Sequence, residues 1–122
     1  MEIKKSIQLT TKPLDTLLKD KYSLDFRLDQ DVWKIINKGD YLEFWEDFSG
    51  YDSKPSKNSR KVIVEVLDIF VSDCFSNLLD DVKDLDYITL GDKSDNLKNF
   101  NHWWPREKEL KFGVKCFYIK II

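Results

Sequence analysis

The chain has 122 residues, which is the length of one ordinary domain with a single hydrophobic core. Hydrophobic residues make up 42% of the sequence and charged residues 34%, a balance that is too apolar for a disordered chain and too polar for a membrane protein. The formal net charge of −2 argues against a protein that coats nucleic acid non-specifically, so any nucleic-acid site must be local.

The chain opens with a predicted strand and a predicted helix. Imperfect alternation of apolar and polar residues indicates a strand over Ile3–Leu9 with one buried face. The helix follows and ends near Asp20, with Thr11 as its expected N-cap and Pro13 in its first turn. Three leucines at helical spacing form its apolar side: Leu14, Leu17 and Leu18.

The segment Tyr22–Leu28 is the clearest predicted strand of the first half, because its apolar and polar residues alternate strictly. One face is expected to lie on the core and carries Tyr22, Leu24, Phe26 and Leu28. The other face is expected to be exposed and carries Ser23, Asp25 and Arg27. The strand therefore presents three polar side chains on one side of the predicted sheet.

The middle of the chain is predicted to form two more strands joined by a loop. Gly39 permits a turn over Lys38–Asp40, and the alternating segment Tyr41–Trp45 follows as a strand. Ser, Gly, Lys and Pro are frequent in Asp47–Arg60, which we expect to be a mobile surface loop. Lys61–Val71 is dense in β-branched residues and is expected to be the long central strand, with a bend or bulge midway.

Two helices and a last strand complete the predicted elements. Phe75–Val82 has apolar residues at helical spacing, and Ser72 or Asp73 is positioned to cap it. A second helix is expected over Ser94–Trp104. The β-branched and aromatic segment Val114–Ile122 is expected to be a largely buried strand.

The order of these elements predicts an α+β fold. Strands dominate, and the chain lacks the regular strand and helix alternation of a parallel sheet. We therefore expect one domain over residues 1–122, built as a mixed β-barrel with two or three short helices. No segment approaches the roughly 20 apolar residues of a membrane-spanning helix, and no signal-peptide core is seen, so we expect a cytoplasmic location and no membrane partner.

Residue types that carry catalysis or bind metal are scarce. His102 is the only histidine, which excludes a multi-histidine metal site, and Cys74 and Cys116 are too few for a disulfide framework or a zinc site. The sequence has no P-loop, dinucleotide fingerprint or glycine-rich phosphate cradle, so we predict no cofactor and no metal. The adjacent acids Glu46–Asp47 and Asp80–Asp81 are expected to be solvated surface pairs.

Three stretches, in this order, are similar to the ASCH family of PUA-like domains. The first is LLKDKYSLDFRL, which resembles the family's helix, turn and strand, and the second is NKGDYLEFW, which resembles its Gly-Asp turn entering a strand. The third is GDKSDNLKNFNHWW with FGVKCFYIKII, which resembles the family's Gly-Asp-x-Ser, helix, histidine before two aromatics and closing strand. The resemblance covers most of the chain and implies a PUA-like barrel with a cleft that meets RNA or nucleotides.

The resemblance also implies where an activity would lie. Some small members of the family are amidohydrolases of acetylated cytidine that use a lysine, a threonine and a glutamate. When Arg27 is matched to the family's strand arginine, Tyr22 stands at the lysine position and Asp25 at the threonine position. Ile88 stands at the glutamate position, and Lys21 lies one residue out of register with the lysine. We therefore predict no catalytic residue and expect a binding module rather than an enzyme.

Several side chains are candidates for contact with a nucleic acid. Arg27 offers a planar fork and Lys21 a point charge for a phosphate, and exposed tryptophans can stack on bases. The candidate ligand-binding residues are Lys21, Tyr22, Ser23, Asp25, Arg27, His102 and Trp103. The leading hypothesis is a module that binds RNA, single-stranded nucleic acid or a modified nucleotide in a cleft.

Two other classes of function stay open from the sequence. An amidohydrolase or ribonuclease that acts on a modified nucleoside or on RNA would use Lys21 and Asp25 as its reacting pair. A protein-interaction domain would use the acidic segment Leu78–Asp86.

Overall fold

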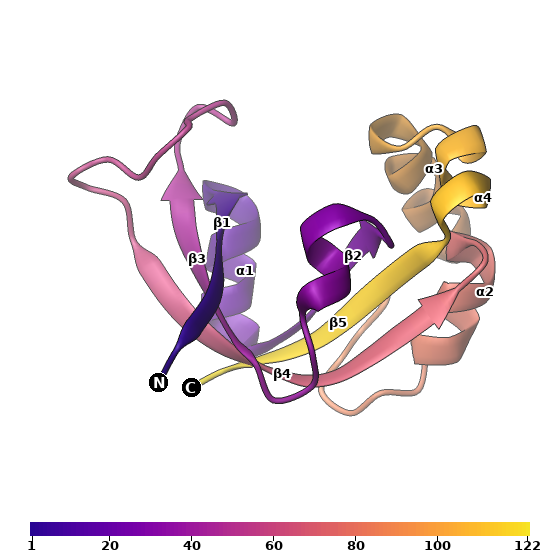
Figure 1. Ribbon diagram of the computed structural model, residues 1–122, viewed down its shortest axis with the longest axis horizontal. Coiled ribbons are helices and arrows are strands. Elements are labelled where there is room, and N and C mark those ends of the chain that lie inside the picture. Colours follow the sequence, from indigo (N-terminus) through magenta and orange to yellow (C-terminus); the bar gives the residue numbers. More distant parts are fainter.

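The computed structural model describes residues 1–122 as one five-stranded sheet with four α-helices and one 3-10 helix (Figure 1). The elements in chain order are β1 (Ile3–Thr10), α1 (Thr11–Asp20), β2 (Tyr22–Leu28), η1 (Asp31–Ile35), β3 (Tyr41–Asp47), β4 (Lys61–Ser72), α2 (Phe75–Val82), α3 (Lys93–Trp103), α4 (Arg106–Phe112) and β5 (Val114–Ile121). The sheet is curled into a half-barrel, which confirms the α+β prediction. Every helix is too short or too polar to cross a lipid bilayer.

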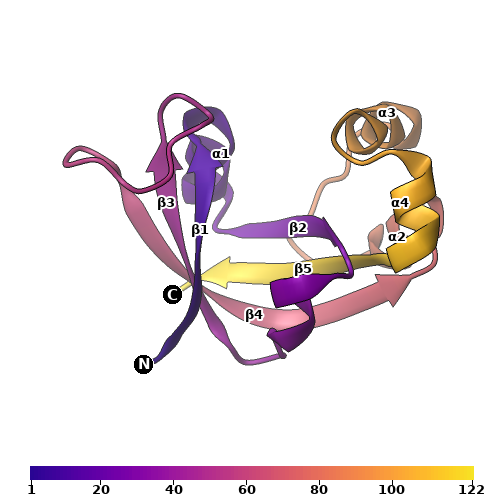
Figure 2. The ribbon, with the colours of Figure 1, turned by 45° about the horizontal axis from the view of Figure 1, so that its top comes forward.

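The strand order is β1-β3-β4-β5-β2, in which β1 is parallel to β3 and every other neighbouring pair is antiparallel. β4 is the central strand, as predicted, because its first part pairs with β3 and most of the strand pairs with β5. The register shifts between Val66 and Asp68, which confirms the predicted bulge midway along β4. On either side of this bend, β1 and β3 stand at one end of the sheet and α2, α3 and α4 at the other (Figure 2).

Two hydrophobic clusters hold the helices against the sheet. In the first, Leu14 and Leu17 of α1 pack with sheet residues that include Phe44, Val64 and Phe117. The second cluster joins α2 to the sheet and contains Leu28, Phe75, Leu78, Val82, Val114 and Cys116. Because the helices cover the two ends of the sheet, most of β2 between them stays partly exposed (Figure 2).

The start of α1 differs from the prediction. Thr10, rather than Thr11, is the N-cap residue, and no side-chain hydrogen bond caps the helix. Thr11 is the first helical residue, and its hydroxyl donates to Oε2 of Glu46 at 2.9 Å. The Thr11 hydroxyl is therefore bonded to a carboxylate that is distant in sequence and does not cap the helix.

The start of α2 differs for a related reason. Cys74 is the N-cap residue, and neither Ser72 nor Asp73 supplies a side-chain cap. Instead, the backbone N–H of Phe75 donates to Oε2 of Glu109 at 2.7 Å, and that carboxylate comes from α4 and is 1% exposed. A tertiary contact thus satisfies a helix donor that the local sequence was expected to satisfy.

The helix count is also higher than the two or three that were predicted. The missed helix, α4, lies between Pro105 at its N-cap and Gly113 after its last turn. Gly113 has a φ of 74°, and its N–H donates to the carbonyl oxygen of Glu109 at 2.9 Å. Proline before a helix and glycine after it are the usual signs of such boundaries, so the sequence did carry a signal for α4.

Glu46 and Asp47 are buried rather than solvated, so this part of the prediction is wrong. They are 2% and 1% exposed, whereas the other acidic pair, Asp80 and Asp81, is exposed as predicted. Arg60 compensates Glu46 through two hydrogen bonds, from Nε to Oε1 at 3.0 Å and from Nη2 to Oε2 at 2.7 Å. Burial is tolerated here because the charge is paired and hydrogen-bonded.

Asp47 anchors the loop that follows β3. Its Oδ1 accepts hydrogen bonds from the backbone N–H groups of Gly50 at 2.9 Å and Asp52 at 3.1 Å. Its Oδ2 accepts from Nε2 of Gln8 on β1 at 3.1 Å. The segment 48–60 contains no helix or strand, as predicted, and these bonds fix its first residues against β1.

Acid is expected to destabilise the fold through Glu46. Hydrogen bonds from Arg60 outweigh the effect of burial and lower the pKa of Glu46 from 4.5 to about 2. Since the pKa is lower in the folded chain than in the unfolded one, this pair stabilises the fold above about pH 4.5, and the stabilisation is lost as the pH falls toward 2. Arg60→Ala should therefore lower the melting temperature near neutral pH. The difference in melting temperature between this variant and the wild type should shrink as the pH falls from about 4.5 to 2.

Thermal melting followed by circular dichroism across this pH range measures the effect. Lys93→Ala is a suitable control, because it removes an ion pair with Asp80 in which both side chains are exposed, 43% and 56%. That variant should melt close to the wild type at every pH. A deficit of Arg60→Ala that stays constant down to pH 2 would show that Glu46 is not the titrating group.

Candidate functional site

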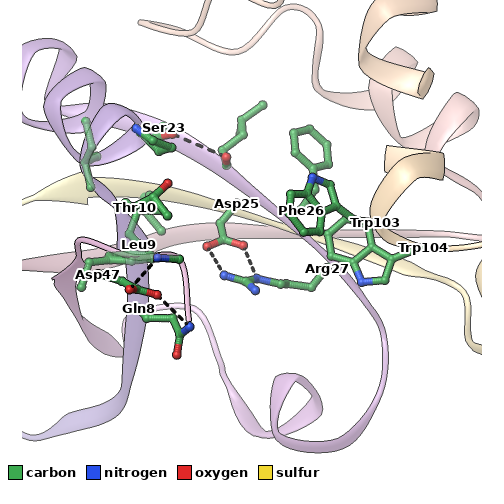
Figure 3. Close-up of a pocket in the computed structure, with 16 residues that line it drawn as sticks. Gln8, Leu9, Thr10, Ser23, Asp25, Phe26, Arg27, Asp47, Trp103 and Trp104 are labelled. Atoms are coloured by element: carbon green, nitrogen blue, oxygen red, sulfur yellow. Dashed lines mark hydrogen bonds and ion pairs between the residues drawn. The ribbon is translucent and has the colours of Figure 1, made fainter. Parts of the chain in front are cut away.

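The inner side of the half-barrel contains a cleft of about 490 Å³ that lies across β2. It is lined by β1 (Gln8, Leu9, Thr10), α1 (Pro13, Leu17), β2 (Ser23, Leu24, Asp25, Phe26, Arg27), β3 and the loop after it (Phe44, Asp47, Gly50), the end of α3 (Trp103, Trp104) and β5 (Ile119) (Figure 3). The cleft therefore draws on segments from both ends of the sheet.

An ion pair on β2 lies in the cleft. Asp25 and Arg27 are two residues apart on one strand, so their side chains share a face. Nε of Arg27 donates to Oδ1 of Asp25 at 2.6 Å, and Nη2 donates to Oδ2 at 3.2 Å (Figure 3). The side chain of Arg27 is only 24% exposed and that of Asp25 only 12%. This face therefore lines the cleft and is less open to solvent than the sequence predicted. The bidentate pairing fixes the orientation of the guanidinium.

Three cations surround Trp33 of η1, next to this ion pair. The guanidinium carbon of Arg27 lies 4.3 Å from the ring centre of Trp33, and Nζ of Lys5 lies 5.1 Å from it. Lys115 is the register partner of Arg27 on β5, and its Nζ donates to the carbonyl oxygen of Trp33 at 3.0 Å. Asp25 is the one carboxylate that pairs with any of these cations. Of the three cations, Arg27 alone lines the cleft, where Asp25 pairs with it.

The two tryptophans at the end of α3 differ in their surroundings. Trp104 belongs to an aromatic group on α2 and α3, with its ring centre 5.4 Å from that of Phe75 and 6.4 Å from that of Phe100. Trp103 is 72% exposed and lines the cleft. Trp104 thus anchors α3 to the protein, while Trp103 presents a free aromatic surface beside the cleft (Figure 3).

The charged lining of the cleft is mixed rather than basic. Asp25 and Asp47 contribute carboxylates and Arg27 contributes the one cation, so the cleft offers both acceptors and donors to a polar ligand. The thiol of Cys116 lies on the strand next to β2, and burial, with a smaller effect of Asp25, raises its pKa. It therefore stays a thiol and is not a nucleophile. No group of three or more His, Cys, Asp or Glu residues is arranged to hold a metal ion.

A second cavity of about 390 Å³ adjoins the first. It lies between α1, the beginning of β2 and the segment before α3, and it is lined by Thr16, Asp20, Tyr22, Ser23, Leu24, Phe26, Tyr87, Ile88, Thr89 and Leu90. Three of these residues, Ser23, Leu24 and Phe26, line both cavities. Its most exposed aromatic ring is that of Tyr87, which is 73% exposed and stacks on Tyr22 with ring centres 4.4 Å apart.

The candidate residues do not all lie in one cavity. Ser23, Asp25, Arg27 and Trp103 line the first cleft. Tyr22 lines the second cavity, where it stacks on Tyr87 and is half-buried.

Lys21 and His102 line neither cavity. Lys21 is the exposed C-cap residue of α1 with a φ of 69°, and this left-handed turn separates it from the regular alternation of β2. His102 is also exposed, and its ring meets Trp103 edge-on with 5.3 Å between ring centres. The proposed reacting pair of Lys21 and Asp25 is therefore not brought together in a cavity.

The side of the cleft opposite β2 was not predicted from the sequence. Gln8, Thr10, Asp47 and Gly50 form much of that side. The parallel pairing of β1 with β3 places the ends of these strands together, with Thr10 beside Asp47. A polar residue at the end of each strand was the available signal, but only the strand order joins the two.

The fold and the cleft define a class of protein: an α+β half-barrel domain with a polar and aromatic cleft across one strand. Solved structures similar to it include the following two. The crystal structure of hypothetical protein PH0355 has a TM-score of 0.72 and 19% sequence identity, and the match covers 97% of this chain and 98% of that one. The solution NMR structure of protein PF0455 from Pyrococcus furiosus has a TM-score of 0.63 and 21% identity, with 97% of each chain covered.

At these identities the likeness establishes the fold alone. No protein-family model matches the chain, and no curated protein sequence matches it.

Proposed function

We propose that the protein is a PUA-like domain of the ASCH type that binds RNA, single-stranded nucleic acid or a modified nucleotide in the cleft across β2. The observation that carries the proposal is the placement of an exposed indole, Trp103, in the same cleft as the Asp25–Arg27 pair. Two of the stretches that resemble the ASCH family supply these residues: LLKDKYSLDFRL provides β2, and GDKSDNLKNFNHWW provides α3.

The chemistry of the cleft suits a nucleobase. A base has two flat faces that stack on aromatic rings and a polar edge that donates and accepts hydrogen bonds. Trp103 and Phe26 offer aromatic surface, Asp25 offers acceptors for an exocyclic amino group, and Arg27 offers donors to a carbonyl or phosphate oxygen. A volume of about 490 Å³ falls within the range of small-molecule sites.

The two alternative functions have less support. Leu78, Leu79 and Val82 of α2 are buried, so the acidic segment Leu78–Asp86 does not present an apolar face to a partner protein. An amidohydrolase or ribonuclease that used Lys21 and Asp25 would need both in one cavity, and Lys21 lies outside both cavities. A binding module is therefore the function that the geometry favours.

Trp103→Ala is expected to weaken binding of a short single-stranded RNA by about 1 to 3 kcal/mol, the usual contribution of one stacked base. Because Trp103 is 72% exposed, the variant should unfold at the wild-type temperature. Isothermal titration calorimetry at low and moderate salt would measure the affinity. Only a few phosphates should be neutralised, so the dependence on salt should be shallow.

Leu110→Ala provides the matched control. Leu110 is a large apolar residue of α4, 62% exposed, and it lines neither cavity, so its loss should leave the affinity unchanged. Equal affinities of wild type and Trp103→Ala would contradict the proposed cleft, and a steep salt dependence would indicate a broad electrostatic surface instead.

A further inference from the structure

We infer that the second cavity is a base-binding subsite and that the ligand is a single-stranded oligonucleotide that crosses β2 and occupies both cavities. This inference rests on the proposed function of the first cleft. It goes further by assigning a site to the Tyr22–Tyr87 pair and by preferring an oligonucleotide to a mononucleotide.

The first support is that the two cavities are adjacent. Ser23, Leu24 and Phe26 belong to the lining of both, so the cavities are neighbours on β2. Tyr22 in the second cavity and Arg27 in the first are five positions apart on β2, which corresponds to about 16 Å, and they lie on opposite faces, so the ligand passes from one face of this edge strand to the other. A single nucleotide occupies one cavity, whereas an extended strand can reach both.

The second support is that each cavity has one largely exposed aromatic ring. Trp103 in the first cleft is 72% exposed and Tyr87 in the second cavity is 73% exposed. The planes of Tyr22 and Tyr87 lie within 16° of each other, so one face of Tyr87 is covered by Tyr22 and the opposite face is open. An open ring face backed by a second ring is suited to stacking on a base.

The third support is the strained backbone that holds Tyr87 in position. Its φ is 63°, in the left-handed region that bulky residues rarely adopt. The preceding residue is fixed by Tyr118, whose hydroxyl donates to the carbonyl oxygen of Asp86 at 2.5 Å. This backbone conformation places the ring of Tyr87 on that of Tyr22 and leaves most of it exposed beside the second cavity.

The fourth support is the distribution of positive charge along β2. Lys120 is the register partner of Tyr22, and its Nζ lies 5.5 Å from the ring centre of Tyr22. At the other end of the strand, Arg27 and its register partner Lys115 supply the cations beside Trp33. A cation is therefore present at each end of the path, where backbone phosphates of the ligand would pass.

The test compares uridine monophosphate with single-stranded tetrauridylate by isothermal titration calorimetry. The wild type should bind the tetranucleotide at least about 10-fold more tightly, because a second base is stacked. Tyr87→Ala should weaken tetranucleotide binding by about 5-fold or more and leave mononucleotide binding unchanged. Tyr87→Phe keeps the ring and should bind both ligands as the wild type does.

Tyr51→Ala is the matched control, since Tyr51 is 93% exposed and lines neither cavity. If it weakens tetranucleotide binding as much as Tyr87→Ala does, the effect does not belong to the second cavity and the inference is wrong. If the mononucleotide binds but the tetranucleotide binds no more tightly, the second subsite fails while the proposed function stands. If neither ligand binds, the proposed function fails and this inference fails with it.

Discussion

Phe75→Ala is expected to lower the free energy of unfolding by about 3 to 5 kcal/mol, the usual cost of removing a fully buried aromatic ring. Phe75 is 0% exposed, and its ring centre lies 4.5 Å from that of Phe100 and 5.4 Å from that of Trp104. It also meets Phe26 of β2 edge-on at 6.5 Å. The substitution would leave a cavity where α2, α3 and β2 meet. Urea denaturation followed by circular dichroism would measure the loss.

Phe48→Ala is the control for this experiment. Phe48 is 54% exposed in the loop after β3, so its removal should change the free energy of unfolding by less than about 0.5 kcal/mol. Similar losses for the two variants would mean that α2 and α3 are not part of the cooperative core. Because Phe75 contacts Trp104, the neighbour of Trp103, Phe75→Ala should also loosen the aromatic side of the cleft.

Glu109→Ala is expected to lower the free energy of unfolding by about 1 to 3 kcal/mol, because it leaves a buried backbone donor without an acceptor. The donor is the N–H of Phe75, which reaches Oε2 of Glu109 at 2.7 Å, and Glu109 itself is 1% exposed. Without this bond, the first turn of α2 would lose its only side-chain acceptor. The same urea denaturation measures the effect.

Glu109→Gln separates the hydrogen bond from the packing. Glutamine has nearly the same shape and keeps one carbonyl oxygen that can accept from the N–H of Phe75. Glu109→Gln should therefore lower the free energy of unfolding clearly less than Glu109→Ala does. Equal losses for the two variants would show that the negative charge, rather than the acceptor, stabilises α2.

The parts of the fold that the sequence predicted well are those with a strong local pattern. Strict alternation over Tyr22–Leu28 matches β2, and the β-branched run from Lys61 matches the central strand with its bulge. The acids Glu46 and Asp47 look like surface residues because no local pattern shows their burial. It depends on Arg60 and on backbone N–H groups of the loop, which only the tertiary structure brings to them.

The candidate site was predicted in part for the same reason. Alternation alone placed Asp25 and Arg27 on one face of β2, and both line the cleft. Lys21 was expected beside them as a phosphate-binding charge, but it is itself the left-handed residue at the end of α1, so the alternation of β2 does not extend to it. Tyr87, which meets Tyr22 from a distant segment, could not be associated with β2 from the sequence at all.

The pairing of β2 with β5 also determines when the cleft can form. Tyr22 is paired with Lys120 and Leu28 with Val114, so the strand that carries Asp25 and Arg27 is synthesised early and its partner late. Contacts between such distant segments slow folding, because the intervening chain must be closed into a loop first. On the ribosome, β2 has no sheet neighbour until β5 has emerged, so its backbone edge and its apolar side chains stay unpaired until the end of synthesis. The cleft across β2 is thus among the last features of the fold that a newly made molecule can complete.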